Sequence, residues 1–377
     1  MQFNKHLFLF LALLVILLEN ASGFIPERRR NYEDREENVY MIIPAIASLP
    51  GAGVFFGVLS SFSNIAGTGI DAAVSKAETI SDESDIHVNA FALREIPLVI
   101  PGLTFEYWFG DIKLNEYNSY LPGRNSPNFT IPYTGEFDYY FLRPAYRFWE
   151  RRISLFYNLI FFKGYAINED GFDTESARHS ASGILLIDLT DDEVDPRIGL
   201  RYRYSLSLTP PTRSFLGEDS DGTDDEERIT TRQHNLSLYI PFTDRFMLVL
   251  NKQTFSAMGR EDSDEVVTGG SLDLRGYPGS RWSDRNGEST AIEGRYTVPL
   301  NTDVDIYLIR GTLDGIQLAA FYETGQVAPE VDGRLQQDLH QSFGFGVRAL
   351  LDAIVLRLDL AFSDEGNQTH LTIDQPF

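Results

Sequence analysis

The sequence predicts an all-β protein, a transmembrane antiparallel β-barrel of about sixteen strands. Three observations lead to this fold class: a secretory signal at the N-terminus, no later apolar run long enough for a membrane-spanning helix, and a succession of strand-length segments with one apolar face. An exported chain of this kind can span a membrane only with strands that close on themselves. We therefore expect the barrel to lie in the outer membrane of a Gram-negative bacterium.

Composition limits the classes of function. The chain has 377 residues, no Cys and a formal net charge of -23, from 32 Lys and Arg against 55 Asp and Glu. The length suits two domains or one large barrel. An acidic chain lacks the basic face that nucleic-acid binding needs, so no nucleic-acid partner is expected. The aromatic share of 13% suits strands, but it does not distinguish a sandwich, a propeller and a barrel.

The N-terminal region divides into a signal and a short tail. A positively charged start precedes an apolar run from Leu7 to Leu18, and small residues follow. This order predicts a signal peptide over residues 1–23, and the alternative is an anchor that stays attached. Residues 24–38 form a polar tail. We expect the barrel to occupy residues 39–377, with no soluble domain ahead of it.

Turn residues and alternation divide the barrel region into sixteen expected strands. They run near 39–48, 53–62, 69–78, 85–94, 102–113, 134–147, 151–165, 178–190, 197–208, 230–241, 245–256, 288–299, 313–324, 341–351, 353–363 and 367–377. In the ninth, Leu200 and Tyr202 lie on one face and Arg201 and Arg203 on the other. A soluble sandwich has the same period, so alternation alone does not decide between a sandwich and a barrel.

The lengths of the connections favour the barrel. If the first strand starts in the periplasm, the outer connections include 114–133, 166–177, 209–229, 257–287 and 325–340, whereas the inner ones are mostly tight, at 149–150, 191–196, 242–244 and 352. Long loops on one side and short turns on the other are typical of outer-membrane barrels. The long inner connection 300–312 and the short outer connection 49–52 depart from this pattern.

One long connection, from about Ala257 to Gly287, carries the most distinctive stretch of the chain. Gly276 lets the backbone bend beside Arg275, and the run Tyr277-Pro278-Gly279 is typical of a turn. These residues indicate a loop that adopts one shape and packs against another part of the molecule. The alternative interpretation is a surface hairpin loop that is rich in Arg.

Several short motifs follow one another in the second half of the chain. They are Asp188-Leu189-Thr190-Asp191-Asp192 with Pro196 and Gly199, Leu274-Arg275-Gly276-Tyr277, Phe321-Tyr322-Glu323-Thr324-Gly325, Phe343-Gly344-Phe345-Gly346-Val347-Arg348 and Gln375-Pro376-Phe377. In this order and spacing, over residues 180–377, they resemble the BamA/TamA family of outer-membrane barrels, also called the bacterial surface antigen family. The resemblance implies a sixteen-stranded barrel whose loop between strands 11 and 12 folds into the lumen.

The resemblance also implies a lock that holds this loop. Its expected members are Arg275, Gly276 and Tyr277 in the loop and Glu293 and Glu323 on the inner wall. Both Glu residues alternate with apolar neighbours, which agrees with side chains that point inward. The family commonly has Asp at the second acidic position. The alternative is that both are ordinary polar residues of a barrel interior. Arg281, in the same loop, is expected to matter less.

The two ends of the sequence carry further expectations. Phe377 is the last residue of the expected strand 367–377. It also resembles the terminal aromatic residue by which barrels of the family are recognised for assembly, which implies a C-terminal assembly signal. Family members that insert barrels or secrete partners have periplasmic polypeptide-transport-associated domains ahead of the barrel. Nothing of that size precedes Val39, so the chain is similar to a form that lacks them.

No catalytic, cofactor or metal site is expected. The His residues show no zinc spacing, and the acidic run 218–227 breaks the spacing of a calcium loop, so a solvated acidic outer loop is the preferred interpretation. No nucleophile elbow occurs in the sequence, and we do not expect an enzyme.

Two membrane functions stay open, and a soluble secreted β-protein that binds a ligand is the third possibility. The resemblance implies a role in protein insertion or translocation at the outer membrane. Its partners would be outer-membrane lipid, client outer-membrane proteins and a separate periplasmic protein. The alternative is a passive or gated pore that keeps the fold without assembly activity.

Overall fold

The computed structural model describes part of the chain. The described residues are 37–49, 53–79, 85–120, 123–127, 130–168, 173–209, 229–259, 266–268, 274–279, 281–352 and 354–377. The expected signal, most of the polar tail and the acidic run 218–227 lie outside them. Within them, no helix has both the length and the apolar character needed to cross a membrane.

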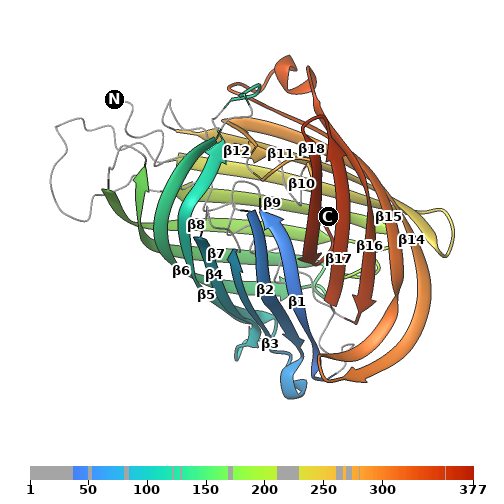
Figure 1. Cartoon of the computed structure of the whole chain (residues 1–377). Helices are drawn as coiled ribbons and strands as arrows, with labels where there is room; N and C mark the ends of the chain where they lie inside the picture. Colours follow the sequence, from blue (N-terminus) through green and yellow to red (C-terminus); the bar gives the residue numbers. More distant parts are fainter. Residues whose placement is uncertain are drawn as a thin grey trace.

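Sixteen antiparallel strands form one continuous sheet that curves into a barrel (Figure 1). The strands are β1 (Val39–Leu49), β2 (Gly53–Ser63), β3 (Asp71–Thr79), β4 (Asp85–Pro97), β5 (Leu103–Tyr120), β6 (Thr130–Phe148), β7 (Ile153–Asn168), β8 (Asp173–Asp188), β9 (Gly199–Thr209), β10 (Ile229–Pro241), β11 (Phe246–Met258), β14 (Asn286–Ile306), β15 (Ile309–Ala328), β16 (His340–Leu351), β17 (Ile354–Ser363) and β18 (Gly366–Ile373). The short strands β12 (Val266–Thr268) and β13 (Trp282–Asp284) pair separately, and the 3-10 turns η2 (Ile65–Gly67) and η3 (Gly333–Gln336) lie in connections. The strand count and order agree with the expectation.

Alternation along the strands places apolar side chains outside and charged side chains inside. On β17, Leu358 and Leu360 are exposed, whereas Arg357 and Asp359, which alternate with them along the strand, are buried. On β16 the exposed side chains include Phe345, which is 61% accessible. A soluble sandwich would bury the apolar face. The reversed arrangement is that of a barrel with a polar interior and an apolar outer surface.

The connections differ between the two ends of the barrel. At one end, here called the loop end, they include 121–129, 210–228, 259–285 and 329–339. At the other, the turn end, they are 64–70, 98–102, 149–152, 189–198, 242–245, 307–308 and 352–353. The connection 300–312, expected to be long, is a two-residue turn, because β14 and β15 extend to meet it.

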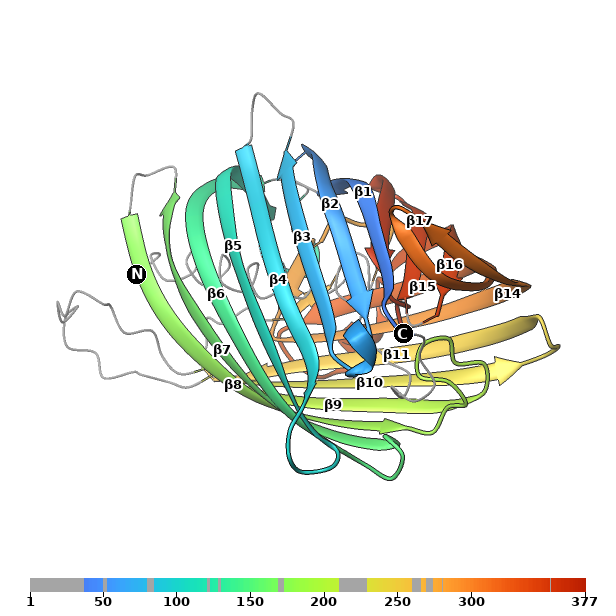
Figure 2. The same cartoon turned by 90° about the horizontal axis from the view of Figure 1, so that it is seen from below.

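The ring does not close between the first and last strands. β1 pairs on its second edge with β15, through Tyr40 with Arg310 and Met41 with Ile309. Thirteen strands, β1 to β11 with β14 and β15, therefore complete the ring, and β16 to β18 are additional. The turn ends of these additional strands pack against buried residues of β1 and β2 in an apolar cluster that includes Met41 and Ile373. Figure 2 shows β16 and β17 next to β1 in the view from below.

Candidate functional site

The candidate site is built around Arg275, in the connection between β11 and β14. Its guanidinium group forms ion pairs with Glu323 on β15 at 2.6 Å, Asp359 on β17 at 2.6 Å and Glu293 on β14 at 2.9 Å. Its backbone N–H also donates to Glu323, at 2.7 Å. All four side chains are fully buried. Arg275 thus contacts both Glu293 and Glu323, which we expected as its partners, and Asp359, which we did not expect.

The charge of Arg275 is matched by its surroundings. Burial alone would lower its pKa, but Glu323 and the other two carboxylates raise the pKa above its ordinary value. The planar guanidinium can donate to several carboxylates at fixed angles, which a Lys cannot do. Further arginines contact the same carboxylates: Arg295, Arg348 and Arg357. We call these seven residues the Arg275 cluster.

Gly276 allows the loop to approach the wall. A Cβ on this residue would lie 2.6 Å from the carbonyl oxygen of Phe362 and 2.6 Å from the side chain of Ser342. The carbonyl of Gly276 accepts a hydrogen bond from Ser363 at 2.8 Å. Only glycine fits a backbone this close to β16 and β17, which explains why it must follow Arg275.

Two glycines of β16 make room on the wall itself. A side chain on Gly346 would meet the carboxylate of Asp359, and one on Gly344 would meet the ring of Phe321. That ring lies flat against Arg275, with the guanidinium carbon 3.3 Å from its centre. The motif Phe343-Gly344-Phe345-Gly346 thus places phenylalanines outside and leaves space for the Arg275 cluster inside.

Tyr277 anchors the other side of the loop. Its hydroxyl donates to Asp364, in the turn between β17 and β18, at 2.5 Å. Its ring packs edge-on against Trp282, with ring centres 4.5 Å apart, in a buried cluster with Leu274 and Val327. The three loop residues that we expected to form the lock therefore all contact the wall.

Arg281 is also held firmly. It forms two short contacts with Glu365, at 2.7 and 2.6 Å, and donates to Ser126 in the connection between β5 and β6. Its guanidinium lies 4.9 Å from the centre of the Trp282 ring. We expected Arg281 to be less important than Arg275, but its surroundings make it a second anchor of the same connection.

The last four residues leave the sheet and enter the barrel. β18 ends at Ile373, and Asp374 has a left-handed backbone with φ 91°. Phe377 lies buried against inner residues of β10, β11 and β14, and its carbonyl accepts a hydrogen bond from Tyr239 at 2.8 Å. The end of the chain lies inside the ring in Figure 2. The expectation that the last strand continues to Phe377 is wrong, because β18 ends at Ile373, and the role of Phe377 as an assembly signal stays a prediction.

A turn from the opposite wall meets this tail. The connection 189–198, between β8 and β9, packs Val194 against Leu350 and Val355, at the turn ends of β16 and β17. Its Asp195 accepts hydrogen bonds from Gln317 on β15 and Gln375 in the tail, each at 3.1 Å. This turn therefore crosses the interior at the turn end, and we call it the crossing turn.

The acidic motif that begins at Asp188 shapes the crossing turn. Asp191 and Asp192 each accept hydrogen bonds from two backbone N–H groups farther along it. Asp188 forms an ion pair with Arg201 and also accepts from Thr190. These bonds satisfy backbone donors that have no strand partner. In this chain the motif is explained by the architecture of the turn.

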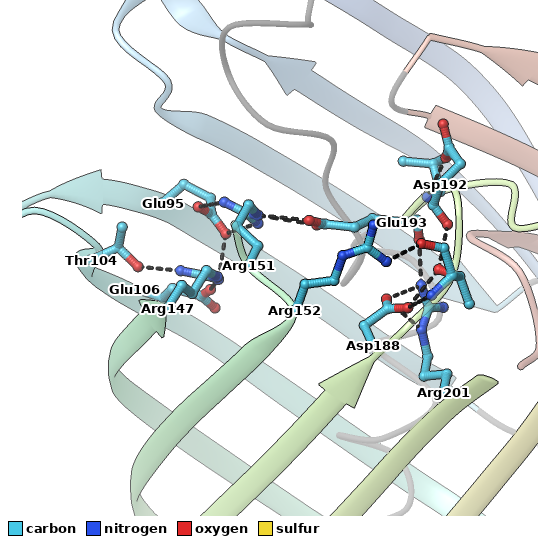
Figure 3. Close-up of polar contacts among 12 residues, drawn as sticks. Glu95, Thr104, Glu106, Arg147, Arg151, Arg152, Asp188, Asp192, Glu193 and Arg201 are labelled. Atoms are coloured by element: carbon cyan, nitrogen blue, oxygen red, sulfur yellow. Dashed lines mark hydrogen bonds and ion pairs between the residues drawn. The ribbon is translucent and has the colours of Figure 1, made fainter. Parts of the chain in front are cut away.

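A second ionic network fastens the crossing turn to the other wall (Figure 3). Arg151, in the turn between β6 and β7, contacts Glu193 of the crossing turn at 3.0 Å and Glu95 of β4 at 3.1 Å. Glu95 also pairs with Arg147, which lies 3.6 Å from Glu106. The network thus joins β4, β5 and β6 to the crossing turn. Our sequence reasoning did not identify it.

Irregular backbone explains why alternation did not reveal this network. Arg94 and Glu95 are neighbours, yet both are buried, because β4 has a bulge between Leu93 and Ile96 and Glu95 has φ 56°. The three residues that end with Arg151 are also left-handed, at φ 52°, 52° and 65°. Non-glycine residues in this region cost about 1–3 kcal/mol each and often mark functional positions. A bulge of this kind has no reliable signal in the sequence.

Comparisons with known proteins bear on the fold. No protein-family model and no curated protein sequence matches the chain. Among solved structures, it resembles CdiB from Escherichia coli (TM-score 0.58, 14% identity, 90% of this chain and 62% of that one) and CdiB from Acinetobacter baumannii (0.55, 12%, 89% and 59%). It also resembles BamA from Haemophilus ducreyi lacking POTRA domains 1-3 (0.51, 12%, 90% and 70%). The fold is that of BamA and CdiB barrels.

This likeness, at identities of 12–14%, concerns the fold alone. The chain spans less than two thirds of the length of either CdiB chain. Among the described residues, no group of side chains is arranged to hold a metal ion. In this chain three anchored segments pack against the inner side of the wall: the loop that carries Arg275, the crossing turn and the tail.

Proposed function

We propose that this chain is an outer-membrane barrel that accepts extended polypeptide segments at the edge of β1, and so assists the insertion or translocation of proteins. Its clients would be unfolded β-proteins of the outer membrane. The observation that carries the proposal is the second edge of β1. Over eleven residues β1 pairs with β2, yet its other edge pairs with β15 at only two residues.

This edge is an available site for strand addition. Among the described residues, no pairing joins β1 to β18, although the two strands are neighbours. Backbone groups without partners cost several kcal/mol each in an apolar environment, roughly in line with the transfer of an amide from water. An extended segment that pairs with the edge would satisfy them, which is how strand addition provides affinity.

Pro44 is consistent with an edge position. The N–H of Ile42 donates to Leu308, away from β2. Since backbone direction alternates along a strand, the nitrogens of Pro44 and Ile46 face the same open edge. Pro44 therefore removes a donor from the open edge and none from the β1–β2 ladder, as expected for proline in an edge strand.

A backbone substitution tests the proposal. The full chain is placed in liposomes, and an unfolded eight-stranded outer-membrane barrel is added. Folding of the added protein is followed by its heat-modifiable gel mobility. We expect the chain to accelerate folding and Ile46→Pro to reduce that acceleration at least fivefold. Ile46→Ala removes the same side chain but keeps the N–H, so the difference between the variants isolates the backbone donor. Equal rates with and without the chain would contradict the proposal.

A gated pore is the second candidate. The observation that favours it is the set of ionic contacts that hold connections against the wall, including Arg275 with Glu323 and Arg151 with Glu193. Bilayer conductance separates the candidates. A pore would conduct ions steadily, and Ile46→Pro would not change its conductance. In a barrel that handles polypeptides, the segments that cross the interior would block the current except during brief openings.

A further inference from the structure

The hairpin formed by the ends of β14 and β15 extends past the neighbouring strand β16. β15 pairs with β16 only from Leu313 onward, but it continues to pair with β14 down to Ile309. The tip is exposed, and Tyr307 is 93% accessible. In Figure 1 this tip meets the start of β1 at the bottom of the barrel.

The tip covers the lower edge of β1 with few backbone pairings, and Ile309 packs against the apolar cluster that includes Met41. Leu308 accepts the N–H of Ile42 at 2.8 Å, and Tyr40 pairs with Arg310. The hydroxyl of Tyr40 reaches the carbonyl of Ile306 at 3.4 Å. These contacts resemble the first residues of an added strand. The pairing of β1 with β2, by contrast, continues along the whole of β1.

Both arms of the hairpin are irregular where they leave the wall. On β14 the register shifts between Pro299 and Thr302, and Asn301 between them has φ 49°. On β15 the pairing with β16 shifts between Leu313 and Gly315. Bulges bend a strand and interrupt its ladder. Paired irregularities at the base of a short hairpin are suited to act as a hinge.

A client segment and the hairpin would need the same backbone groups. Pro44 supplies no donor, so it separates the open-edge donor of Ile42, which the tip covers, from that of Ile46 farther along the strand. A segment that pairs with β1 from its lower end must replace Leu308 as the acceptor for Ile42. The tip and a client segment therefore cannot occupy this part of the β1 edge at the same time.

We propose that the hairpin tip, residues 306–310, is a detachable cap on the edge of β1, which leaves when an extended polypeptide segment pairs there. The cap protects the edge in the resting barrel, because an unpaired edge is a template for unwanted pairing. Its displacement by a client rests on the proposed function, whereas its ability to detach does not.

Hydrogen exchange tests detachment without any client. The N–H of Ile42 faces the tip, whereas those of Met41 and Ile43 face β2. In the full chain in lipid nanodiscs, we expect the Ile42 amide to exchange at least ten times faster than its two neighbours, because opening of the hairpin exposes it alone. If the exchange rates of the three amides lie within a factor of three of one another, the proposal of a detachable cap is overturned.

A reversible cross-link tests the need for displacement. The chain has no Cys, so Tyr40→Cys with Arg310→Cys introduces one disulfide between directly paired residues. The folding of the unfolded eight-stranded barrel is measured with oxidised and reduced samples of this variant. We expect at least tenfold slower folding in the oxidised sample. The control, Arg232→Cys with Ser256→Cys, cross-links β10 to β11 on another part of the wall and should show no redox dependence.

The two measurements separate the cap from the proposed function. Equal activity of oxidised and reduced samples would show that the tip need not leave, and would overturn the inference. If the unmodified chain does not accelerate folding at all, the proposed function fails. The exchange of Ile42 then still decides the cap, because fast exchange supports detachment and uniform exchange contradicts it.

Discussion

At the scale of single residues, Arg275 stands among three carboxylates that come from three different strands. Removal of its guanidinium leaves them buried beside Arg295, Arg348 and Arg357, with one positive charge fewer. Breaking a buried ion pair in this way costs about 3–5 kcal/mol. We expect Arg275→Ala to release the loop and raise its sensitivity to protease, and Arg275→Lys to restore protection only in part.

Limited proteolysis of the folded barrel at the 259–285 connection measures this effect. The matched control is Arg334→Ala, because Arg334 is an exposed arginine at the same end whose ion pairs with Glu330 and Asp332 are on the surface. Such pairs contribute about 0–1 kcal/mol. Equal cleavage of wild type and Arg275→Ala would show that the Arg275 cluster does not hold the loop.

The glycines of β16 allow a second test at this scale. A methyl group on Gly346 would overlap the carboxylate of Asp359, whereas one on Gly294 would lie 3.4 Å from the ring of Phe246, an ordinary contact. Overpacking of this kind costs about 1–3 kcal/mol. We expect Gly346→Ala to lower the thermal transition of the barrel and loosen the Arg275 loop, and Gly294→Ala to do neither. Similar transitions for both variants would contradict the role assigned to Gly346.

At the scale of elements, the crossing turn should respond to pH through Asp195. Burial raises the pKa of Asp195 above its ordinary value, and Arg295 on β14 and Arg348 on β16 oppose this only in part. A carboxyl group with a raised pKa in the folded state stabilises that state when protonated. The stabilisation is complete below its ordinary pKa and is lost as pH rises through the raised value.

We therefore expect the crossing turn to be most firmly docked in acid and to loosen as pH rises through the pKa of Asp195. Protease sensitivity of residues 189–198, measured across this pH range, tests the expectation. Asp195→Asn keeps the shape and the amide contacts with Gln317 and Gln375 but cannot ionise, so it should remove this component of the pH dependence. If protease sensitivity depends on pH in Asp195→Asn as it does in the wild type, another group causes the effect.

At the scale of the whole molecule, the outer surface decides where the protein lies. Exposed phenylalanines and leucines, among them Phe343 and Leu360, form the face that a soluble protein would bury. We expect the chain to partition to the outer membrane, to resist extraction by high salt or alkali, and to show heat-modifiable gel mobility after detergent extraction. A folded monomer in the soluble periplasmic fraction would contradict the barrel interpretation.

Much of this architecture was predictable because its signals are local. The side-chain period of a strand is two, so the alternation of Arg357 and Asp359 with leucines already assigns the inner and outer faces. Turn residues then separate the strands in order. The loop with Arg275, Gly276 and Tyr277 and its partners Glu293 and Glu323 followed from a family resemblance together with this alternation, and the structure brings these residues together.

Other features depended on the tertiary structure, because they join residues that are far apart in the chain. The sequence indicated that Asp359 faces inward, but only the curvature of the sheet brings it to Arg275. The ring is closed by β15 rather than β18, and this depends on the positions that the β14–β15 hairpin and the C-terminal tail take in the folded barrel. Phe377 continues an apparently regular strand in the sequence, yet Asp374 turns it into the interior toward Tyr239. Local periodicity determines which face a residue occupies, whereas the packing of the closed barrel determines which residue it meets.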